Sequence, residues 1–97
     1  MGLFVENGPY SVTQNLDLNI RATGWNNLYN MLYIDQPVGT GFSFTGNDAG
    51  YANNNEELAS DLYEFMIQFY TMFPYLVANE LYFVGESYAG KYYTRFT

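Results

Sequence analysis

A serine near the end of the chain lies in a pattern that could perform covalent catalysis. The apolar residues 81–84 are followed by Gly85 and, two positions later, by Ser87, and small residues come again at Ala89 and Gly90. A strand that ends in a strained turn and continues as a helix lifts a serine hydroxyl above the sheet edge, where a base can reach it. Small neighbours are needed because side chains would collide in so tight a turn. The pattern predicts a nucleophile elbow and acyl transfer through a serine ester.

The match to the general G-x-S-x-G pattern is incomplete. Ala89 stands where the second glycine is expected, and the glycine comes one residue later, at Gly90. The alternative is an ordinary strand-to-helix turn in which Ser87 caps the helix. These few residues alone leave both interpretations open.

Three segments of the chain resemble the serine carboxypeptidases, a branch of the α/β-hydrolase fold. Residues 85–92 (Gly-Glu-Ser-Tyr-Ala-Gly-Lys-Tyr) resemble the nucleophile motif of that family, which itself has Ala and then Gly after its Ser-Tyr pair. Residues 31–43 are similar to a second signature of the family, and residues 6–10 are similar to a third. The three segments come in the family's order, and the resemblance covers nearly the whole chain.

The resemblance implies a set of roles around Ser87. Ser87 is the predicted nucleophile, and the backbone N–H of Tyr88 is a predicted oxyanion donor because it follows the nucleophile at a helix start. The second donor is expected from a glycine-rich loop that the family has upstream of Leu3. In this fold the acid and the histidine base follow the serine, and the chain contains no histidine. We therefore expect an incomplete fragment that is inactive alone.

Substrate binding is predicted for two acidic residues and their neighbours. In serine carboxypeptidases the glutamate that matches Glu86 pairs with one that aligns with Glu6, and together they hold the free C-terminal carboxylate of a peptide. Two acids that face a carboxylate must share protons, so such a site donates hydrogen bonds only at acidic pH. Asn7 and Gly8 are predicted to lie beside the same carboxylate. The alternative for Glu6 is a position in a surface turn. Asp35 precedes the serine, whereas the catalytic acid of this fold follows it, so Asp35 is expected to shape the cleft floor and not to act as that acid.

Composition narrows the function classes. The net charge is −7 with only three basic residues, which disfavours nucleic-acid binding because phosphate neutralisation needs clustered Lys and Arg. The 11 Tyr and 8 Phe suit a piece of a larger core or an apolar cleft. There is no cysteine for disulfide or thiol chemistry, and no apolar run is long enough to span a membrane. The first residues do not resemble a signal peptide, and no metal or other cofactor is expected.

The order of apolar segments predicts an α/β protein, namely a partial α/β-hydrolase fold with a mainly parallel sheet flanked by helices. Strands are expected at residues 2–5, 11–20, 28–34 and 81–84, and a loop at 38–55. A helix should begin after the Asn triplet at 53–55, continue with apolar residues at three- and four-residue steps, and end near Phe73 before Pro74. A second helix should begin at residue 88. Residues 1–97 are expected to form a single fragment of one hydrolase domain.

Residues and resemblance together favour a serine-type carboxypeptidase that releases C-terminal residues from peptides through an acyl-enzyme at acidic pH. The alternatives are an acyltransferase of the same fold, which uses an alcohol in place of water, and a non-catalytic relative that keeps the motif. The expected partners are peptide or protein C termini and the rest of the parent chain, with no nucleic acid and no membrane. The resemblance implies a lysosomal, vacuolar or secreted protein.

Overall fold

The structure of the protein is a computed structural model that describes residues 2–93. It divides the chain into two compact units, Met1–Ile34 and Asp35–Thr97. The second helix is predicted to continue over residues 94–97, and that part of the prediction lies outside the described residues. The expectation of one domain fragment over residues 1–97 stays a prediction.

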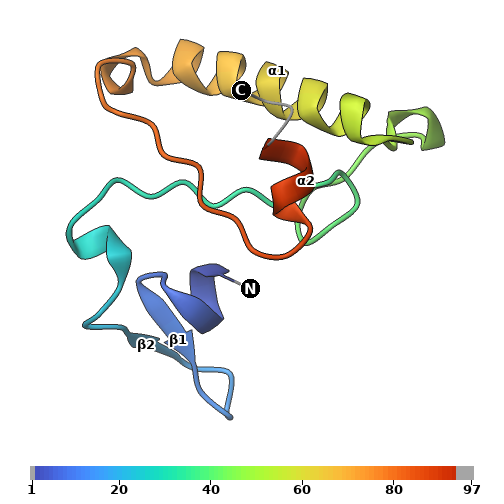
Figure 1. Ribbon diagram of the computed structural model, residues 1–97. Coiled ribbons are helices and arrows are strands. Elements are labelled where there is room, and N and C mark those ends of the chain that lie inside the picture. The colour runs from blue at the N-terminus through green and yellow to red at the C-terminus, as the bar shows by residue number, and fades with distance from the viewer. Residues whose placement is uncertain (1, 94–97) are drawn as a thin grey trace. The chain divides into compact units, whose positions relative to one another are not determined.

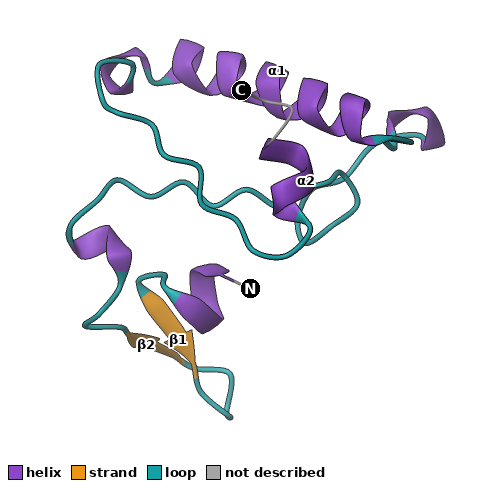
Figure 2. Ribbon diagram, viewed as in Figure 1, coloured by secondary structure: helices purple, strands orange, loops and turns teal. Residues whose placement is uncertain are grey.

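The first unit contains a β-hairpin, drawn in orange in Figure 2. Strand β1 (Tyr10–Val12) pairs antiparallel with β2 (Leu18–Ile20). Between them the Thr13 hydroxyl oxygen accepts hydrogen bonds from the backbone N–H groups of Asn15 at 3.2 Å and Asp17 at 3.1 Å. Such local side-chain hydrogen bonds offer the backbone an alternative to an extended ladder. The single strand predicted for this segment is therefore wrong in its middle, where the chain turns back on itself.

The first residues of this unit are helical. Gly2–Glu6 form one turn of π-helix, so the strand predicted at residues 2–5 is wrong. The backbone N–H groups of Asn7 and Gly8 donate to the Gly2 carbonyl oxygen at 3.1 and 3.2 Å. Backbone groups need partners, and this turn supplies them locally, whereas a strand would need a neighbouring strand.

The second unit is built on helix α1 (Asn55–Met72), the long helix in Figure 1. The Asn54 side chain caps its first turn, and Glu56 and Glu57 lie near the positive end of the helix dipole. At the other end the Phe73 N–H still donates to the Phe69 carbonyl oxygen at 2.9 Å, and a separate short turn begins at the next residue, a proline. The predicted helix, with its asparagine cap and its proline stop, is confirmed.

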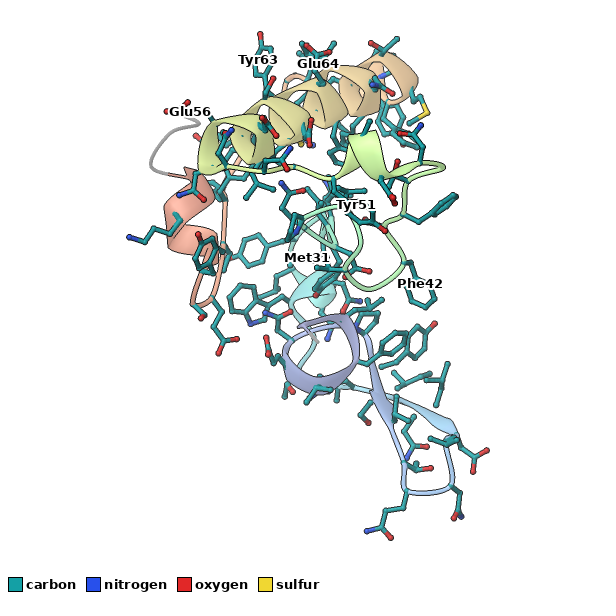
Figure 3. The ribbon with its side chains drawn as sticks, turned by 90° about the vertical axis from the view of Figure 1, so that its right-hand side faces the viewer. Met31, Phe42, Tyr51, Glu56, Tyr63 and Glu64 are labelled. Carbon is teal, nitrogen blue, oxygen red and sulfur yellow. The ribbon has the colours of Figure 1, made fainter. Side chains whose placement is uncertain are left out.

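One face of α1 supplies the small core of this unit. Leu58, Leu62 and Met66 are the buried apolar side chains among the described residues, and their four-residue spacing places them on one side of the helix. Tyr63 and Glu64 project outward from the helix in Figure 3. The predicted apolar face of α1 is therefore confirmed at these three residues, whereas Phe65, which the same period places on that face, is 37% exposed.

The loop before α1 and the helix near the end of the chain also follow prediction. Residues 38–54 form a loop with one short 3-10 turn, Asp48–Gly50. Helix α2 (Ala89–Tyr93) begins one residue after its predicted start. Among residues 2–93 no helix has the length and apolar content needed to cross a membrane.

A parallel sheet is absent from the described residues. Their one sheet is the hairpin of β1 and β2, which is antiparallel. Residues 28–34 and 81–84 have the composition of strands but are not strands in this structure. A strand exists only where a neighbour completes its ladder of hydrogen bonds, so an apolar run is not sufficient by itself. These two strand predictions are corrected for that reason.

Candidate functional site

Ser87 has an unusual backbone conformation. Its φ is +58°, and it is one of two non-glycine residues with positive φ in the described part of the chain. The left-handed region costs a residue with a Cβ atom about 1–2 kcal/mol, and such outliers gather at functional sites. A helix N-cap residue normally has an extended backbone, so this conformation does not fit the alternative in which the serine caps the helix.

The turn around Ser87 leads directly into helix α2. The N–H of Ala89 donates to the Glu86 carbonyl oxygen at 3.2 Å, and the N–H of Gly90 donates to that of Ser87 at 3.3 Å. The segment before the turn belongs to no helix or strand, and both Glu86 and Ser87 are exposed. The exposed hydroxyl on a strained residue at a helix start is the geometry that a nucleophile elbow needs.

Tyr88 connects this turn to the long helix of the same unit. Its hydroxyl donates to Oδ1 of Asn55, the first residue of α1, at 3.2 Å. The two residues are 33 positions apart. The bond ties the residue that follows the predicted nucleophile to the capped end of α1, and so it limits how the turn can move.

Glu6, Asn7 and Gly8 follow one another at the end of the π-helix in the first unit. Glu6 is exposed and Gly8 is buried. A Cβ atom at Gly8 would collide with the backbone carbonyl oxygen of Leu3, so only glycine fits there. The close approach of two backbone segments at Gly8 holds the three residues in one arrangement.

Asn7 is hydrogen-bonded through its side chain to Tyr33. The Tyr33 hydroxyl donates to Oδ1 of Asn7 at 2.8 Å, in a partly buried position. Burial raises the pKa of the Tyr33 hydroxyl, and the positive charge of Arg21 opposes that shift. Nη2 of Arg21 donates to the Phe4 carbonyl oxygen at 2.9 Å, within the π-helix.

Asp35 organises the loop that follows it. Its Oδ2 accepts the backbone N–H of Phe42 at 2.9 Å, and its backbone carbonyl oxygen accepts the Ser43 hydroxyl at 2.7 Å. The neighbouring Gln36 donates through Nε2 to the Leu58 carbonyl oxygen of α1 at 2.9 Å. Phe42 itself is 90% exposed and projects from this loop in Figure 3. Asp35 therefore stabilises the loop that follows it through these hydrogen bonds.

The structure keeps the predicted site residues in two groups. Glu86, Ser87 and Tyr88 share one turn in the second unit, and Glu6, Asn7 and Gly8 share one turn in the first. The pairing of Glu6 with Glu86 stays a prediction, as do the roles of all these residues. Within residues 2–93, no group of His, Cys, Asp and Glu side chains could hold a metal ion.

Sequence reasoning missed the two Tyr–Asn hydrogen bonds, which join Tyr33 to Asn7 and Tyr88 to Asn55. Partners that lie 26 and 33 positions apart leave no periodic signal in the sequence. The only available hint, that a buried tyrosine hydroxyl usually finds a hydrogen-bond partner, applies to the partly buried Tyr33 and not to Tyr88, which is 55% exposed.

Comparison with known proteins assigns the chain to a family. The family model for serine carboxypeptidases matches residues 1–97. The chain is 55% identical over 95 residues to the "Probable serine carboxypeptidase CPVL" of Dictyostelium discoideum, covering 98% of this chain and 19% of that protein. It is 56% identical over 91 residues to the Homo sapiens protein of the same name, covering 94% and 19%. It is 52% identical over 91 residues to the "Venom serine carboxypeptidase" of Apis mellifera, covering 94% and 20%.

The chain therefore spans about a fifth of the length of these curated relatives. The match extends through all three segments that resemble the family, including the turn at Ser87. The chain belongs to the serine carboxypeptidase family.

Proposed function

We propose that this chain is part of a serine-type carboxypeptidase that releases residues from peptide C termini through an acyl-enzyme formed on Ser87. The observation that carries the proposal is the φ of +58° at Ser87, immediately before α2 and inside the segment that matches the family's nucleophile motif. A strained, exposed serine immediately before a helix is part of the arrangement that α/β-hydrolases use for attack on a carbonyl carbon. The names of the relatives support the same reaction.

In this reaction Oγ of Ser87 attacks the carbonyl carbon of the last peptide bond and gives its proton to a base. The carbonyl oxygen becomes an oxyanion, which accepts a hydrogen bond from the backbone N–H of Tyr88. The C–N bond then breaks, and the released amine takes a proton from the same base. Water hydrolyses the ester and frees Ser87. The chain has no histidine, and in this fold the acid and the histidine base both follow the serine, so we expect the rest of the parent chain to supply them.

Recognition of the substrate's free carboxylate falls to Glu6, Glu86, Asn7 and Gly8. Two glutamates that face a carboxylate can bind it only while they share protons, so binding should weaken as the pH rises. Replacing Glu86 by glutamine keeps a hydrogen-bond donor that does not titrate. In the full-length protein Glu86→Gln should flatten the rise of KM with pH, and an unchanged pH profile would show that this carboxylate clamp is wrong.

The proposed architecture is an α/β-hydrolase domain. Residues 28–34 and 81–84 carry apolar and aromatic side chains that suit buried strands, and they would become strands once the parent chain supplies their neighbours. The large exposed apolar side chains of these segments support this, with Leu28 at 82%, Tyr29 at 66% and Val84 at 62% exposure. By analogy with the family, the protein would work in a lysosome or vacuole, or after secretion.

A serine-directed fluorophosphonate probe tests the proposed function on the full-length protein. Only an activated serine reacts with it, so wild-type protein should be labelled and Ser87→Ala should not. Release of free C-terminal residues from a peptide should be lost in parallel. No labelling of the wild-type protein would favour a non-catalytic relative. Labelling combined with transfer of the acyl group to an added alcohol, in place of hydrolysis, would favour an acyltransferase.

A further inference from the structure

The strained backbone of Ser87 needs support from outside its own turn. Left-handed conformations of residues other than glycine persist only where the surrounding structure holds them in place. Within the turn, the N–H of Gly90 reaches the Ser87 carbonyl oxygen at 3.3 Å, which is long for a backbone hydrogen bond. The proposed strand at residues 81–84 would hold the turn from one side, because it ends before Ser87. Support on the other side must come from residues after the serine.

The side chain of Tyr88 reaches such a support at the start of helix α1. Its hydroxyl donates to Oδ1 of Asn55 at 3.2 Å. Asn55 is the first residue of α1 and is partly buried. A hydroxyl and an amide can each donate and accept, so the link between the two side chains exists whichever of them supplies the proton. The residue that follows Ser87 is therefore joined to α1.

The first turn of α1 is itself held by side-chain hydrogen bonds. Oδ1 of Asn54 accepts the backbone N–H groups of Glu56 and Glu57. In return, the Glu57 carboxylate accepts the Asn53 N–H at 2.7 Å and Nδ2 of Asn54 at 2.9 Å. Reciprocal bonds of this kind satisfy the backbone donors at a helix start. They lie on both sides of Asn55 along the chain, so its backbone is fixed and its side chain can act as an anchor.

We propose that Asn55 is a positioning residue for the attack by Ser87 and that it acts through the hydroxyl of Tyr88. This inference rests on the proposed function. The backbone of Tyr88 continues directly from Ser87, so a shift of the Tyr88 side chain would also displace the Ser87 hydroxyl. A displacement of about 1 Å in a reacting group can cost about a hundredfold in rate. Loss of the link should therefore slow the attack and leave binding of the peptide nearly unchanged.

The rate of labelling by a fluorophosphonate probe measures the attack in the full-length protein. Oγ of Ser87 forms a bond to phosphorus, fluoride leaves, and the base takes the hydroxyl proton. Tyr88→Phe removes only the Tyr88 hydroxyl and should slow labelling about two- to fivefold, the lower half of what one hydrogen bond contributes, because 3.2 Å is long for a hydroxyl donor. In single turnovers of a peptide, the acylation rate constant should fall by a similar factor, with the dissociation constant of the peptide unchanged.

Asn55→Ala removes the other partner, and the two substitutions form a double-mutant cycle. If one hydrogen bond carries the effect, Asn55→Ala slows labelling by a similar factor, and the double variant is no slower than the slower single variant. Asn55→Asp keeps an acceptor oxygen and should restore labelling close to the wild-type rate. A purely structural role would lower Tm in each variant without this coupling between the two positions.

Tyr75→Phe is the matched control, because Tyr75 belongs to the same unit and its side chain is 73% exposed. It should be labelled at the wild-type rate. Equal labelling rates in the wild-type and Tyr88→Phe proteins would overturn the inference, and so would losses that add up in the double variant. The proposed function survives either result if Ser87→Ala abolishes labelling. If the wild-type protein shows no Ser87-dependent labelling, the proposed function fails, and the inference fails with it.

Discussion

Replacing Asn54 by alanine should loosen the start of helix α1. Oδ1 of Asn54 accepts the backbone N–H groups of Glu56 at 3.0 Å and Glu57 at 2.9 Å. Without this oxygen both donors must turn to water, because the first N–H groups of a helix have no partner within it. Loss of an N-cap costs about 1–2 kcal/mol when the cap is well formed. We expect the upper half of that range, since one oxygen serves two donors.

The consequence should extend to the predicted nucleophile. Asn55 begins α1, and its side chain accepts the hydroxyl of Tyr88, the residue after Ser87. If the first turn of α1 frays, Asn55 no longer offers its oxygen at a fixed place. Asn54→Ala should therefore raise mobility at the turn of residues 86–88 as well as in the first turn of the helix.

Amide hydrogen exchange on the full-length protein measures both effects. A loss of about 1.5–2 kcal/mol corresponds to exchange about twelve- to thirtyfold faster at Glu56 and Glu57. Asn47→Ala is the control, because Asn47 precedes the short turn Asp48–Gly50 and its side chain makes no capping hydrogen bond. Asn54→Ser keeps an acceptor oxygen and should restore most of the protection. Equal exchange in the Asn54→Ala and Asn47→Ala proteins would refute the assigned role of the cap.

Three further results are expected. The Asn53 backbone N–H is the main cause that holds the pKa of the Glu57 carboxyl below its usual value. The ionised Glu57 carboxylate therefore stabilises the folded state above the unfolded pKa of about 4.3, and this stabilisation is lost as the pH falls through the lower folded value. The protection of α1 amides against exchange should fall between about pH 6 and about pH 3 in the wild-type protein. The part of this fall that comes from the Glu57 carboxylate should be absent in Glu57→Gln. Gly41→Ala places a Cβ against the Asp35 carboxylate at a φ of +52°, so exchange of the Phe42 amide should rise about tenfold. Residues 1–97 expressed alone should aggregate, because they expose many large apolar side chains. A soluble monomer with a sharp two-state melt would contradict this last expectation.

The part of the fold that the sequence predicts well is helix α1. Its determinants are local: an asparagine cap at Asn54, apolar residues such as Leu58, Leu62 and Met66 on one face, and Pro74 at the end. Each of them acts over one turn of helix, so a short window of sequence contains the whole signal. The loop before the helix and the start of α2 are predicted for the same reason.

Strands depend on partners that a short window does not contain. Residues 28–34 and 81–84 have the composition of strands, and composition cannot supply the neighbour whose backbone completes the ladder. The hairpin was missed for a related reason. Leu16, Leu18 and Ile20 alternate with polar residues as a strand would. Leu16, however, lies inside the turn that the Thr13 hydroxyl stabilises, and strand β2 begins only at Leu18. A short-range hydrogen bond there prevails over a weak periodic pattern.

The candidate site depends both on local sequence and on partners that lie far along the chain. The motif gives the order of Glu86, Ser87 and Tyr88 along the chain. The positive φ of Ser87 follows from a turn that the sequence indicates. The orientation of those groups comes from residues far along the chain, with Asn55 holding Tyr88 and Tyr33 holding Asn7. Because a displacement of about 1 Å in a reacting group can cost a hundredfold in rate, these supports matter as much as the motif. Variants of Ser87 test whether this serine is an activated nucleophile. Variants of Tyr33 and Tyr88 test whether their hydrogen bonds orient the neighbouring groups.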